Sequence, residues 1–485
     1  MKQDKTAIDE KGIKARKSEN FSEWYVQTLI KSEFIDYSEV SGMYILRPSA
    51  YGVWQEIARV VDQKLKKSGV ENVYFPIFIP EKFLAKEASH VKGFTPEVAW
   101  VTESGETKMK ERLAVRPTSE AMMYPTYAKW IRSWRDLPLR YNQWNSVVRW
   151  EFKDPTPFLR TREFLWHEGH SVFATEKEAE EERDAILPMY LEVLKDYLAL
   201  PGIVGRKSDK EKFAGAIASY SIEHILPNGY AIQGPAFHLD GQNFAKAYGI
   251  KFLDKEGGSS YGWQNTYAIS TRNIGIMIMV HGDDKGLVIP PRLAYVQVVI
   301  VPIYKDETRG KVIEFAREVE KVLHENFRVK VDDRESYSPG FKFNEWEMKG
   351  VPLRVEVGPK EADANKVVIV RRDSGAKSDT DLGNLSQKVS AILDAIQQSL
   401  YKRAEEFMVK NIHSVKDYSE FKKVLADKGG IIHAPWCMGQ ACEDKIKEET
   451  GAKITNIPFN HCPLEPKCIY CGRRAKAMAN FAKSY

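Results

Sequence analysis

The segment RTREFLWHEGH, residues 160–170, brings arginine, aromatic and carboxylate side chains together at a spacing that suits a ligand with both phosphate groups and a flat ring. If the segment is a β-strand, its side chains alternate between two faces, so Arg160, Phe164 and Trp166 share one face. Guanidinium groups bind phosphate through paired hydrogen bonds, and an aromatic face accepts a planar base or a cation. Taken alone, the segment fits a salt-bridged amphipathic strand equally well.

The preceding segment VVRWEF, residues 147–152, adds a second cation and a carboxylate. Arg149 and Glu151 are two residues apart, so on a strand they would share one face. The turn-rich sequence KDPTP separates the two segments and predicts a β-hairpin. Across this hairpin, Arg149 and Glu151 would meet Arg160 and Phe164, so that one sheet surface would hold two cations, a ring and a carboxylate.

The tetrapeptide PTSE, residues 117–120, has two compatible interpretations. Thr118 would cap a helix whose first turn contains Glu120, a position where the helix dipole favours a negative charge. A carboxylate held at the start of a helix can also bind an ammonium group, with the Thr118 hydroxyl as a further hydrogen-bonding group. We expect both interpretations to apply.

The five cysteines of the chain lie close to its C-terminal end. Cys437 and Cys442 form a C-x4-C pair, and Cys468 and Cys471 form a C-x2-C pair. Two such pairs are typical of a tetrahedral Zn²⁺ site, and because the protein supplies all four ligands, the metal should be structural. Free thiols are the alternative, and Cys462 stands outside both pairs.

Length and composition limit the class of protein. A chain of 485 residues predicts about three domains. The formal net charge of +5 permits a nucleic-acid partner without requiring one. The longest apolar runs, such as IGIMIMV, are too short to span a bilayer, and the charged N-terminal segment lacks the apolar stretch of a signal peptide. We therefore expect a cytoplasmic protein with no membrane contact.

The elements that must position these residues differ along the chain. A long helix starting at Pro48 and an edge strand broken by Pro76 precede the hairpin, and a capped helix near Thr175 and further strands follow it. After residue 294, apolar strands alternate with amphipathic helices, which is typical of an α/β domain with a parallel or mixed sheet. A third domain, which contains the cysteines, begins at about residue 405.

The motifs resemble those of the class II aminoacyl-tRNA synthetases. The Arg-x-Glu pair, a short loop and Arg-x-x-x-Phe resemble motif 2, and the Pro48 helix with the Pro76 strand resembles motif 1. ISTRNIGIMIMV, a strand that leads to Arg272 at a helix start, resembles motif 3. Over nearly the whole chain, RPTSE, RTREFLWHEGH, AIQGPAFH, GDDKGLVIPPR and the cysteine-rich tail resemble prolyl-tRNA synthetases of the archaeal/eukaryotic type.

The resemblance implies a multi-domain α/β protein that forms a homodimer. The expected domains are an N-terminal arm (1–20), a class II catalytic domain with an antiparallel sheet (21–294), an α/β anticodon-binding domain (295–404) and a small zinc-binding α+β domain (405–485). The dimer interface would include the motif 1 helix and the Pro76 strand. A physical argument independent of the resemblance also supports a dimer. A proline-interrupted strand is a sheet edge with unpaired backbone groups, and a second subunit could cover it together with the apolar face of the adjacent helix.

The implied activity is a two-step ligation. ATP, as its Mg²⁺ complex, would activate L-proline to prolyl-adenylate, and the prolyl group would pass to the 3′ end of tRNA(Pro), with release of AMP and diphosphate. The alternatives are a sister class IIa synthetase for threonine or histidine, and a non-catalytic tRNA-binding paralogue. The presence of Arg149, Arg160 and Arg272 favours an active enzyme.

By resemblance, three arginines carry the catalysis. Arg149 would bridge the proline carboxylate and the α-phosphate, and Arg160 would reach the terminal phosphates. Phe164 and Arg272 would hold the adenine between them. The other expected nucleotide contacts are Glu151, Thr161, Ser270 and Gln233, the last of which would also contact Mg²⁺. The expected proline-binding residues are Thr118, Glu120, Arg149, Trp166 and His238.

The segment FKFNEWEMKGVPLR, residues 341–354, is expected to contact the anticodon because the middle domain resembles the anticodon-binding domain of these enzymes. Its cations would meet phosphates, and its glutamates would accept hydrogen bonds from base amines. A solvated helix face is the alternative. The residues concerned are Lys342, Glu345, Glu347, Lys349 and Arg354.

Overall fold

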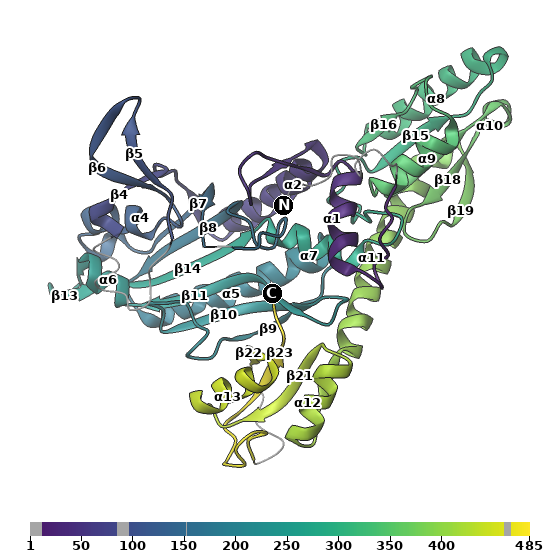
Figure 1. The fold of residues 1–485 in the computed structure, drawn as a ribbon. Coiled ribbons are helices and arrows are strands. Elements are labelled where there is room, and N and C mark those ends of the chain that lie inside the picture. Colours follow the sequence, from purple (N-terminus) through teal and green to yellow (C-terminus); the bar gives the residue numbers. More distant parts are fainter. Residues whose placement is uncertain (1–11, 85–96, 152, 460–466) are drawn as a thin grey trace.

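The computed structural model describes residues 12–84, 97–151, 153–459 and 467–485, and their elements form an α/β fold in three units (Figure 1). A large sheet occupies the centre, a second α/β unit lies at the upper right, and the C-terminal unit, in yellow, lies below the centre (Figure 1). Within the described ranges, every helix is too short or too polar to cross a bilayer.

An antiparallel sheet forms the central unit and contains the hairpin that the sequence predicts. Its strands are β3 (Glu71–Asn72), β7 (Leu139–Val148), β8 (Glu163–Phe173), β9 (Ile203–Arg206), β10 (Ala218–Ile225), β11 (Ala231–Gly241) and β14 (Trp263–Ser270). In the order β9-β10-β11-β14-β8-β7, all neighbours run antiparallel, whereas β3 pairs in parallel with β7. Every residue of β10 is buried, so both faces of the sheet are covered there.

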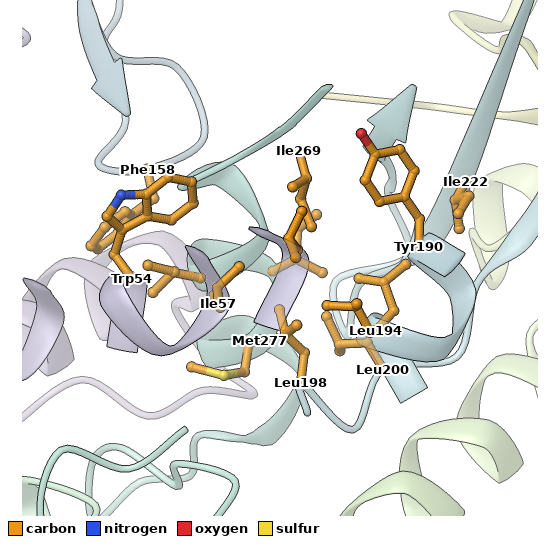
Figure 2. Close-up of a cluster of buried hydrophobic side chains, with 14 of the residues drawn as sticks. Trp54, Ile57, Phe158, Tyr190, Leu194, Leu198, Leu200, Ile222, Ile269 and Met277 are labelled. Atoms are coloured by element: carbon orange, nitrogen blue, oxygen red, sulfur yellow. The ribbon is translucent and has the colours of Figure 1, made fainter. Parts of the chain in front are cut away.

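Three helices pack on one face of this sheet. They are α2 (Pro48–Lys67), α5 (Glu176–Asp196) and α7 (Arg272–His281). Trp54 and Ile57 of α2 belong to one buried cluster with Tyr190 of α5, Ile269 of β14 and Met277 of α7 (Figure 2). Apolar side chains fill most of this face, and Phe164, Trp166, Glu168 and His170 of β8 point to the opposite face.

The strand predicted around Pro76 is broken into two. β3 ends at Asn72, and β4 (Phe78–Pro80) belongs to a separate sheet with β5 (Trp100–Ser104) and β6 (Thr107–Val115). Pro76 lies between β3 and β4 because it has no N–H group to donate to a strand ladder. The shorter elements of the central unit are α1 (Phe21–Lys31), β1 (Ile35–Tyr37), β2 (Tyr44–Leu46), α4 (Glu120–Trp130), α6 (Asn243–Tyr248), β12 (Lys251–Leu253) and β13 (Ser259–Tyr261).

The second unit has the mixed sheet that the sequence predicts. Its strands are β15 (Val298–Pro302), β16 (Val329–Val331), β17 (Leu353–Val357), β18 (Lys366–Arg371) and β19 (Lys377–Asp381). β16, β15 and β17 run parallel, and β18 and β19 continue the sheet in antiparallel register. Its helices are α8 (Arg309–His324), α9 (Pro339–Met348), α10 (Pro359–Ala364) and α11 (Leu385–Lys410).

The C-terminal unit is joined to its neighbours more closely than the sequence indicates. Its elements are β20 (Ile412–Ser414), α12 (Tyr418–Asp427), β21 (Ile431–Trp436), α13 (Gln440–Thr450), β22 (Lys453–Pro458) and β23 (Ala477–Ala482). Helix α11 runs without a break through residues 404 and 405. β22 pairs with β9, so the described residues of the two units share one eleven-stranded sheet. A Cβ atom on Gly205 would lie 2.6 Å from the Ile457 carbonyl oxygen, so this pairing requires glycine.

Candidate active site

A pocket of about 180 Å³ lies on the face of the central sheet opposite α2, α5 and α7, beside α4 and α6. His167 contacts Tyr190 of α5, so its neighbours Trp166 and Glu168 point to the opposite face. β8, β11, β14 and the first residues of α4 and α7 supply the walls. The lining residues are Thr118, Glu120, Arg149, Phe164, Trp166, Glu168, His170, Phe213, Gln233, Gly234, Ala236, His238, Thr266, Tyr267, Ala268, Ser270 and Arg272.

The pocket brings together most of the candidate residues from the sequence. The alternation predicted for the hairpin holds within β8, where Phe164, Trp166, Glu168 and His170 all line the pocket. The register places Trp166 opposite Ser270 of β14, which lies two residues before the start of α7. The predicted residues that line the pocket are Thr118, Glu120, Arg149, Phe164, Trp166, Gln233, His238, Ser270 and Arg272.

The predicted strand placement of Arg149, Glu151 and Arg160 is wrong. β7 ends at Val148 and β8 begins at Glu163, so these three residues lie in the connecting loop. Two prolines in KDPTP lack the N–H group that a longer ladder would need. Arg149 still reaches the pocket, whereas Glu151 and Arg160 are exposed outside its lining.

Thr161 also lies outside the pocket lining. It is buried and lines an adjacent cavity of about 230 Å³, with which the pocket shares the ring of Phe164. The loop therefore presents its candidate residues in different environments: Arg149 inside, Arg160 at the surface and Thr161 behind Phe164.

The arginines form an electropositive end of the pocket. The Nε atom of Arg149 donates to the carbonyl of Pro117 at 3.0 Å, and its guanidinium lies 5.3 Å from the Phe164 ring centre. Burial and the repulsion of Arg149 and Arg160 lower the pKa of Arg272 to about 10. Arg272 stays charged at neutral pH, and a bound polyphosphate would relieve this repulsion.

Glu120 and Thr118 line the same pocket. Ser119, not Thr118, is the N-cap residue of α4, so the predicted capping role of Thr118 is wrong. The Thr118 hydroxyl instead donates to the carboxylate of Glu120, which is buried in the first turn as expected. Burial raises the pKa of Glu120, with the nearby charge of Glu168 adding to this and His170 opposing it.

Glu168 and His170 are pocket residues that were not assigned a role from the sequence. The Glu168 carboxylate accepts hydrogen bonds from Ser119 N at 3.2 Å, Asn145 Nδ2 at 2.6 Å and Gln143 Nε2 at 3.3 Å. His170 Nε2 lies 3.1 Å away and completes a buried ion pair. Their alternation with Trp166 in WHEGH was the signal that could have identified them.

These hydrogen bonds decide the charges of the pair. Burial alone would raise the pKa of Glu168, but the bonds from His170, Ser119 and Asn145 outweigh it and hold this pKa at about 2. Burial opposes the charge of His170, but Glu168 and Glu120 raise its pKa above the ordinary value. The pair is therefore ionised in the folded protein near neutral pH.

Trp166 and His238 form the remaining walls near Glu120. The indole Nε1 of Trp166 donates to Asn145 Oδ1 at 2.7 Å, which fixes its ring. His238 lies on the Phe213 ring at 4.7 Å, and its Nδ1 atom lies 2.8 Å from the hydroxyl of Ser219. Burial and the charges of Lys207 and Arg149 lower the pKa of His238 to about 3, so it is neutral at physiological pH.

The four paired cysteines lie together at one end of the C-terminal unit, with their sulfur atoms all within 4.8 Å of one another. Cys437 Sγ lies 3.6 Å from Cys442 Sγ and 3.8 Å from Cys471 Sγ. Tetrahedral Zn–S bonds would set such sulfurs about 3.8 Å apart, so the cluster fits a metal of this kind. Cys462 lies outside the described residues.

The candidate anticodon residues on α9 are held by partners within the chain. Lys342 is buried and donates to the Asp332 carbonyl at 3.0 Å. Glu345 accepts from Lys349 at 2.6 Å and Glu347 accepts from Lys285 at 2.8 Å. The remaining candidate, Arg354, pairs with Glu356 at 2.8 Å and lies 4.1 Å from the centre of the Phe343 ring.

Comparison with known proteins matches three family models along the chain. They are "tRNA synthetase class II core domain (G, H, P, S and T)" at residues 100–281, "Anticodon binding domain" at 297–392 and "Prolyl-tRNA synthetase, C-terminal" at 418–485.

Relatives of known name and structure match over almost the whole chain. A Bacillus cereus protein named proline–tRNA ligase 2 is 48% identical over 96% of this chain and 97% of its own length. The proline–tRNA ligase of Cenarchaeum symbiosum is 46% identical over 98% and 99%. The crystal structure of prolyl-tRNA synthetase from Cryptosporidium parvum, complexed with halofuginone and AMPPNP, superposes with a TM-score of 0.94 at 45% identity, covering 100% of this chain and 99% of that one.

Replacement of Glu168 by Gln is expected to lower the midpoint of urea-induced unfolding, because His170 then loses the carboxylate that stabilises its charge. Breaking one side of a buried ion pair costs about 3–5 kcal/mol. Because the pKa of Glu168 is lower in the folded protein than in the unfolded chain, its ionised carboxylate stabilises the fold at pH values above the unfolded-chain pKa. This stabilisation is lost in acid. Because the pKa of His170 is higher in the folded protein than in the unfolded chain, its protonated ring stabilises the fold at pH values below the unfolded-chain pKa. This stabilisation is lost as the pH rises. The difference from wild type should therefore be largest between about pH 4.5 and 6.5.

The matched control is Glu192→Gln, because Glu192 pairs with Lys64 at the surface, where its side chain is 54% exposed. This variant should unfold at the wild-type midpoint at every pH, since exposed ion pairs contribute little. Urea titrations followed by tryptophan fluorescence at several pH values provide the measurement. A shift for Glu168→Gln that does not vary with pH would contradict the charged state of the pair.

Proposed function

The chain belongs to the proline–tRNA ligase family, and we propose that the pocket on the face of its central sheet opposite α2, α5 and α7 binds proline and ATP side by side. The enzyme activates L-proline with ATP to prolyl-adenylate and transfers the prolyl group to the 3′ end of tRNA(Pro), releasing AMP and diphosphate. Neither a threonyl or histidyl synthetase nor a non-catalytic tRNA-binding paralogue finds support among the relatives.

One observation carries the assignment of the pocket: a buried carboxylate, Glu120, and a half-buried guanidinium, Arg149, line the same small space. Proline at neutral pH has a secondary ammonium and a carboxylate. The ammonium would meet Glu120 and Thr118, and the carboxylate would meet Arg149. Trp166 and the neutral His238 would enclose the ring.

The nucleotide would occupy the electropositive end. Phe164 and Arg272 would hold the adenine, and Arg160 at the rim would reach the terminal phosphates. The proposed contacts of the rest of the nucleotide are Glu151, Thr161, Ser270 and Gln233. Mg²⁺ would enter with ATP as part of the substrate, and the Gln233 amide oxygen is the group proposed to contact it.

The chemistry explains why the pocket relies on arginines rather than on a general base. The proline carboxylate is already anionic at neutral pH, so one of its oxygens can attack the α-phosphorus directly while diphosphate leaves. Charge accumulates on the α-phosphate in the transition state, and Arg149 is proposed to neutralise it and to align the two substrates.

The remaining parts of the chain complete the proposal. Residues 1–20 would form an arm, 21–294 the catalytic domain, 295–404 the anticodon-binding domain and 405–485 the C-terminal domain. The anticodon would lie against α9 and its exit, with Lys342 supporting this surface from below and with Glu345, Glu347, Lys349 and Arg354 closer to the RNA. We place the enzyme in the cytoplasm, where tRNA charging takes place.

A structural zinc ion is proposed for the cysteine cluster. Cys437, Cys442, Cys468 and Cys471 would supply four thiolates, and Arg473, whose Nε atom donates to Cys471 Sγ at 3.4 Å, favours the thiolate form of that residue. Because all four ligands come from the protein, the ion would stabilise the fold without taking part in the reaction.

A homodimer is proposed with α2 and the connection between β3 and β4 in its interface. Tyr74 is 73% exposed, and Phe78 and Trp130 beside it are 42% and 49% exposed. The rings of Phe75 and Trp130 lie 6.0 Å apart, which ties this apolar surface to α4. A second copy of the chain would cover these rings.

Proline-dependent ATP–diphosphate exchange tests the assignment of the pocket. Arg149→Ala should reduce exchange by more than about 100-fold, because it removes a cation matched to transition-state charge. Arg317→Ala, at an exposed position of α8, is the control and should exchange as the wild type does. Exchange stimulated by threonine or histidine in place of proline would refute the proposed function.

The zinc proposal is tested by elemental analysis of the purified protein, which should contain about one equivalent of zinc. Cys468→Ser should remove the metal and increase protease cleavage after about residue 430 while the catalytic sheet stays folded. Cys462→Ser is the matched control and should retain the metal. If Cys462→Ser loses zinc and Cys437→Ser retains it, the ligand set is wrong.

Sedimentation velocity tests the dimer. The wild type should sediment as a dimer at micromolar concentration, and Tyr74→Asp combined with Phe78→Asp should shift it toward monomer because charges would be buried in the interface. Tyr337→Asp, at an exposed aromatic position of the anticodon-binding unit, should remain dimeric. A monomeric wild type would exclude the proposed interface.

A further inference from the structure

The segment that follows α7 is the place where the catalytic unit meets the end of α9. Leu287 N donates to the carbonyl of Met348 at 3.0 Å, and Ile289 N donates to that of Gly350 at 3.4 Å. Gly286 adopts φ +131°, and a Cβ atom there would lie 2.5 Å from the Met348 carbonyl oxygen. Two backbones in such close contact cannot shift independently.

One guanidinium spans this junction. Arg372, the residue after the end of β18, donates from Nη1 and Nη2 to the two carboxylate oxygens of Asp283 at 2.8 and 2.6 Å. Its Nε atom donates to the carbonyl of Glu347, in the last turn of α9, at 2.7 Å. The Arg372 side chain is only 3% exposed whereas Asp283 is 45% exposed, so these charge-assisted bonds are shielded from water on the side of the arginine.

Asp283 directly follows Gly282, the C-cap residue of α7, and its backbone is bound to α1. Its carbonyl accepts from Trp24 Nε1 at 2.9 Å. Lys17 Nζ donates to the carbonyls of Val280 and Gly282 at 3.2 and 2.6 Å, which satisfies the end of the helix. Burial opposes the charge of Asp283, but the bonds from Arg372 outweigh it and lower its pKa, so the ion pair is present at neutral pH.

Helix α7 connects Asp283 to the pocket. Its residues 273–279 are all buried, so the helix is held on every side and moves as a body. Arg272, its first residue, lines the pocket. Ten residues of α-helix span about 15 Å, so a displacement of Asp283 would have to act over about this distance to reach Arg272.

We propose that Arg372 and Asp283 are positioning residues through which the anticodon-binding unit sets the placement of Arg272 in the pocket. The path runs from the last turn of α9 through Arg372 and Asp283 to α7. It rests on the proposed function, because α9 matters to catalysis only if the anticodon lies against it. When RNA contacts Glu347 or Lys349, the end of α9 and the Arg372 guanidinium are stabilised in one position, and Arg272 with them.

Aminoacylation of two tRNA(Pro) transcripts tests the path, one with the native anticodon and one with all three anticodon bases replaced. The wild type should show both a lower kcat and a higher KM for the replaced transcript. In Arg372→Gln and Asp283→Asn, the kcat for the native transcript divided by the kcat for the replaced transcript should be about fivefold or more smaller than in the wild type, and so closer to one. The corresponding ratio of KM values should equal that of the wild type. A merely structural role would not separate the two ratios.

Arg371→Gln is the matched control, because Arg371 makes the same bidentate contact with Asp373, at 2.9 Å for each bond, but within the anticodon-binding unit. It should keep both wild-type ratios. If Arg372→Gln does not fold, the test rests on Asp283→Asn alone, because the Asp283 side chain is 45% exposed and its replacement should be tolerated.

The outcomes separate the two proposals. A wild type that charges both transcripts equally well would refute the anticodon assignment and the path with it. A wild type that discriminates through KM alone would leave the anticodon assignment intact and overturn the path. Discrimination through kcat that Asp283→Asn preserves in full would overturn the path as well.

Discussion

The removal of charged side chains from water is the constraint on which the pocket depends. A buried carboxylate is stable only when several donors replace its water, and Glu168 receives them from Ser119, Gln143, Asn145 and His170. These bonds connect the start of α4 with β7 and β8. They therefore fix the position of Glu120, the residue that follows Ser119, before any substrate enters.

The same constraint links the pocket to the C-terminal unit. Glu223 of β10 is buried opposite Gln233 of β11 and accepts a hydrogen bond from Lys207 Nζ at 2.6 Å. Lys207 also donates to the carbonyl of Thr455 in β22 at 2.7 Å. A buried ion pair needs such additional partners to offset its desolvation, so the pairing of β22 with β9 supports residues beneath the candidate ATP site. A cysteine cluster that orders the C-terminal unit would thus act on the pocket without touching it.

The spacing of residues along the chain predicts the features that depend only on residues close together in the sequence. The alternation of β8, the capping box of Thr175 and Glu178, and the grouping of the cysteines all follow from spacing alone. The donors of Glu168 could not be predicted, because they become neighbours only when α4, β7 and β8 assemble. The pairing of β22 with β9 and the continuity of α11 depend in the same way on contacts between distant segments. Arg149 was found by its type but misplaced, because the end of β7 is set by the prolines of the loop.

The charged groups around the pocket are unevenly distributed, as the surroundings of two histidines indicate. His170 lies beside Glu168 and Glu120, which raise its pKa, whereas His238 lies near Lys207 and Arg149, which add to the effect of burial in lowering its pKa. The pocket wall therefore holds both carboxylates, Glu120 and Glu168, and guanidinium groups, Arg149 and Arg272. A zwitterion enters such a field in one orientation, because the reverse would set its ammonium against arginines and its carboxylate against Glu120. In the orientation that we propose, the proline ammonium meets Glu120 and the carboxylate meets Arg149, which would bring this carboxylate toward the α-phosphate of the proposed ATP.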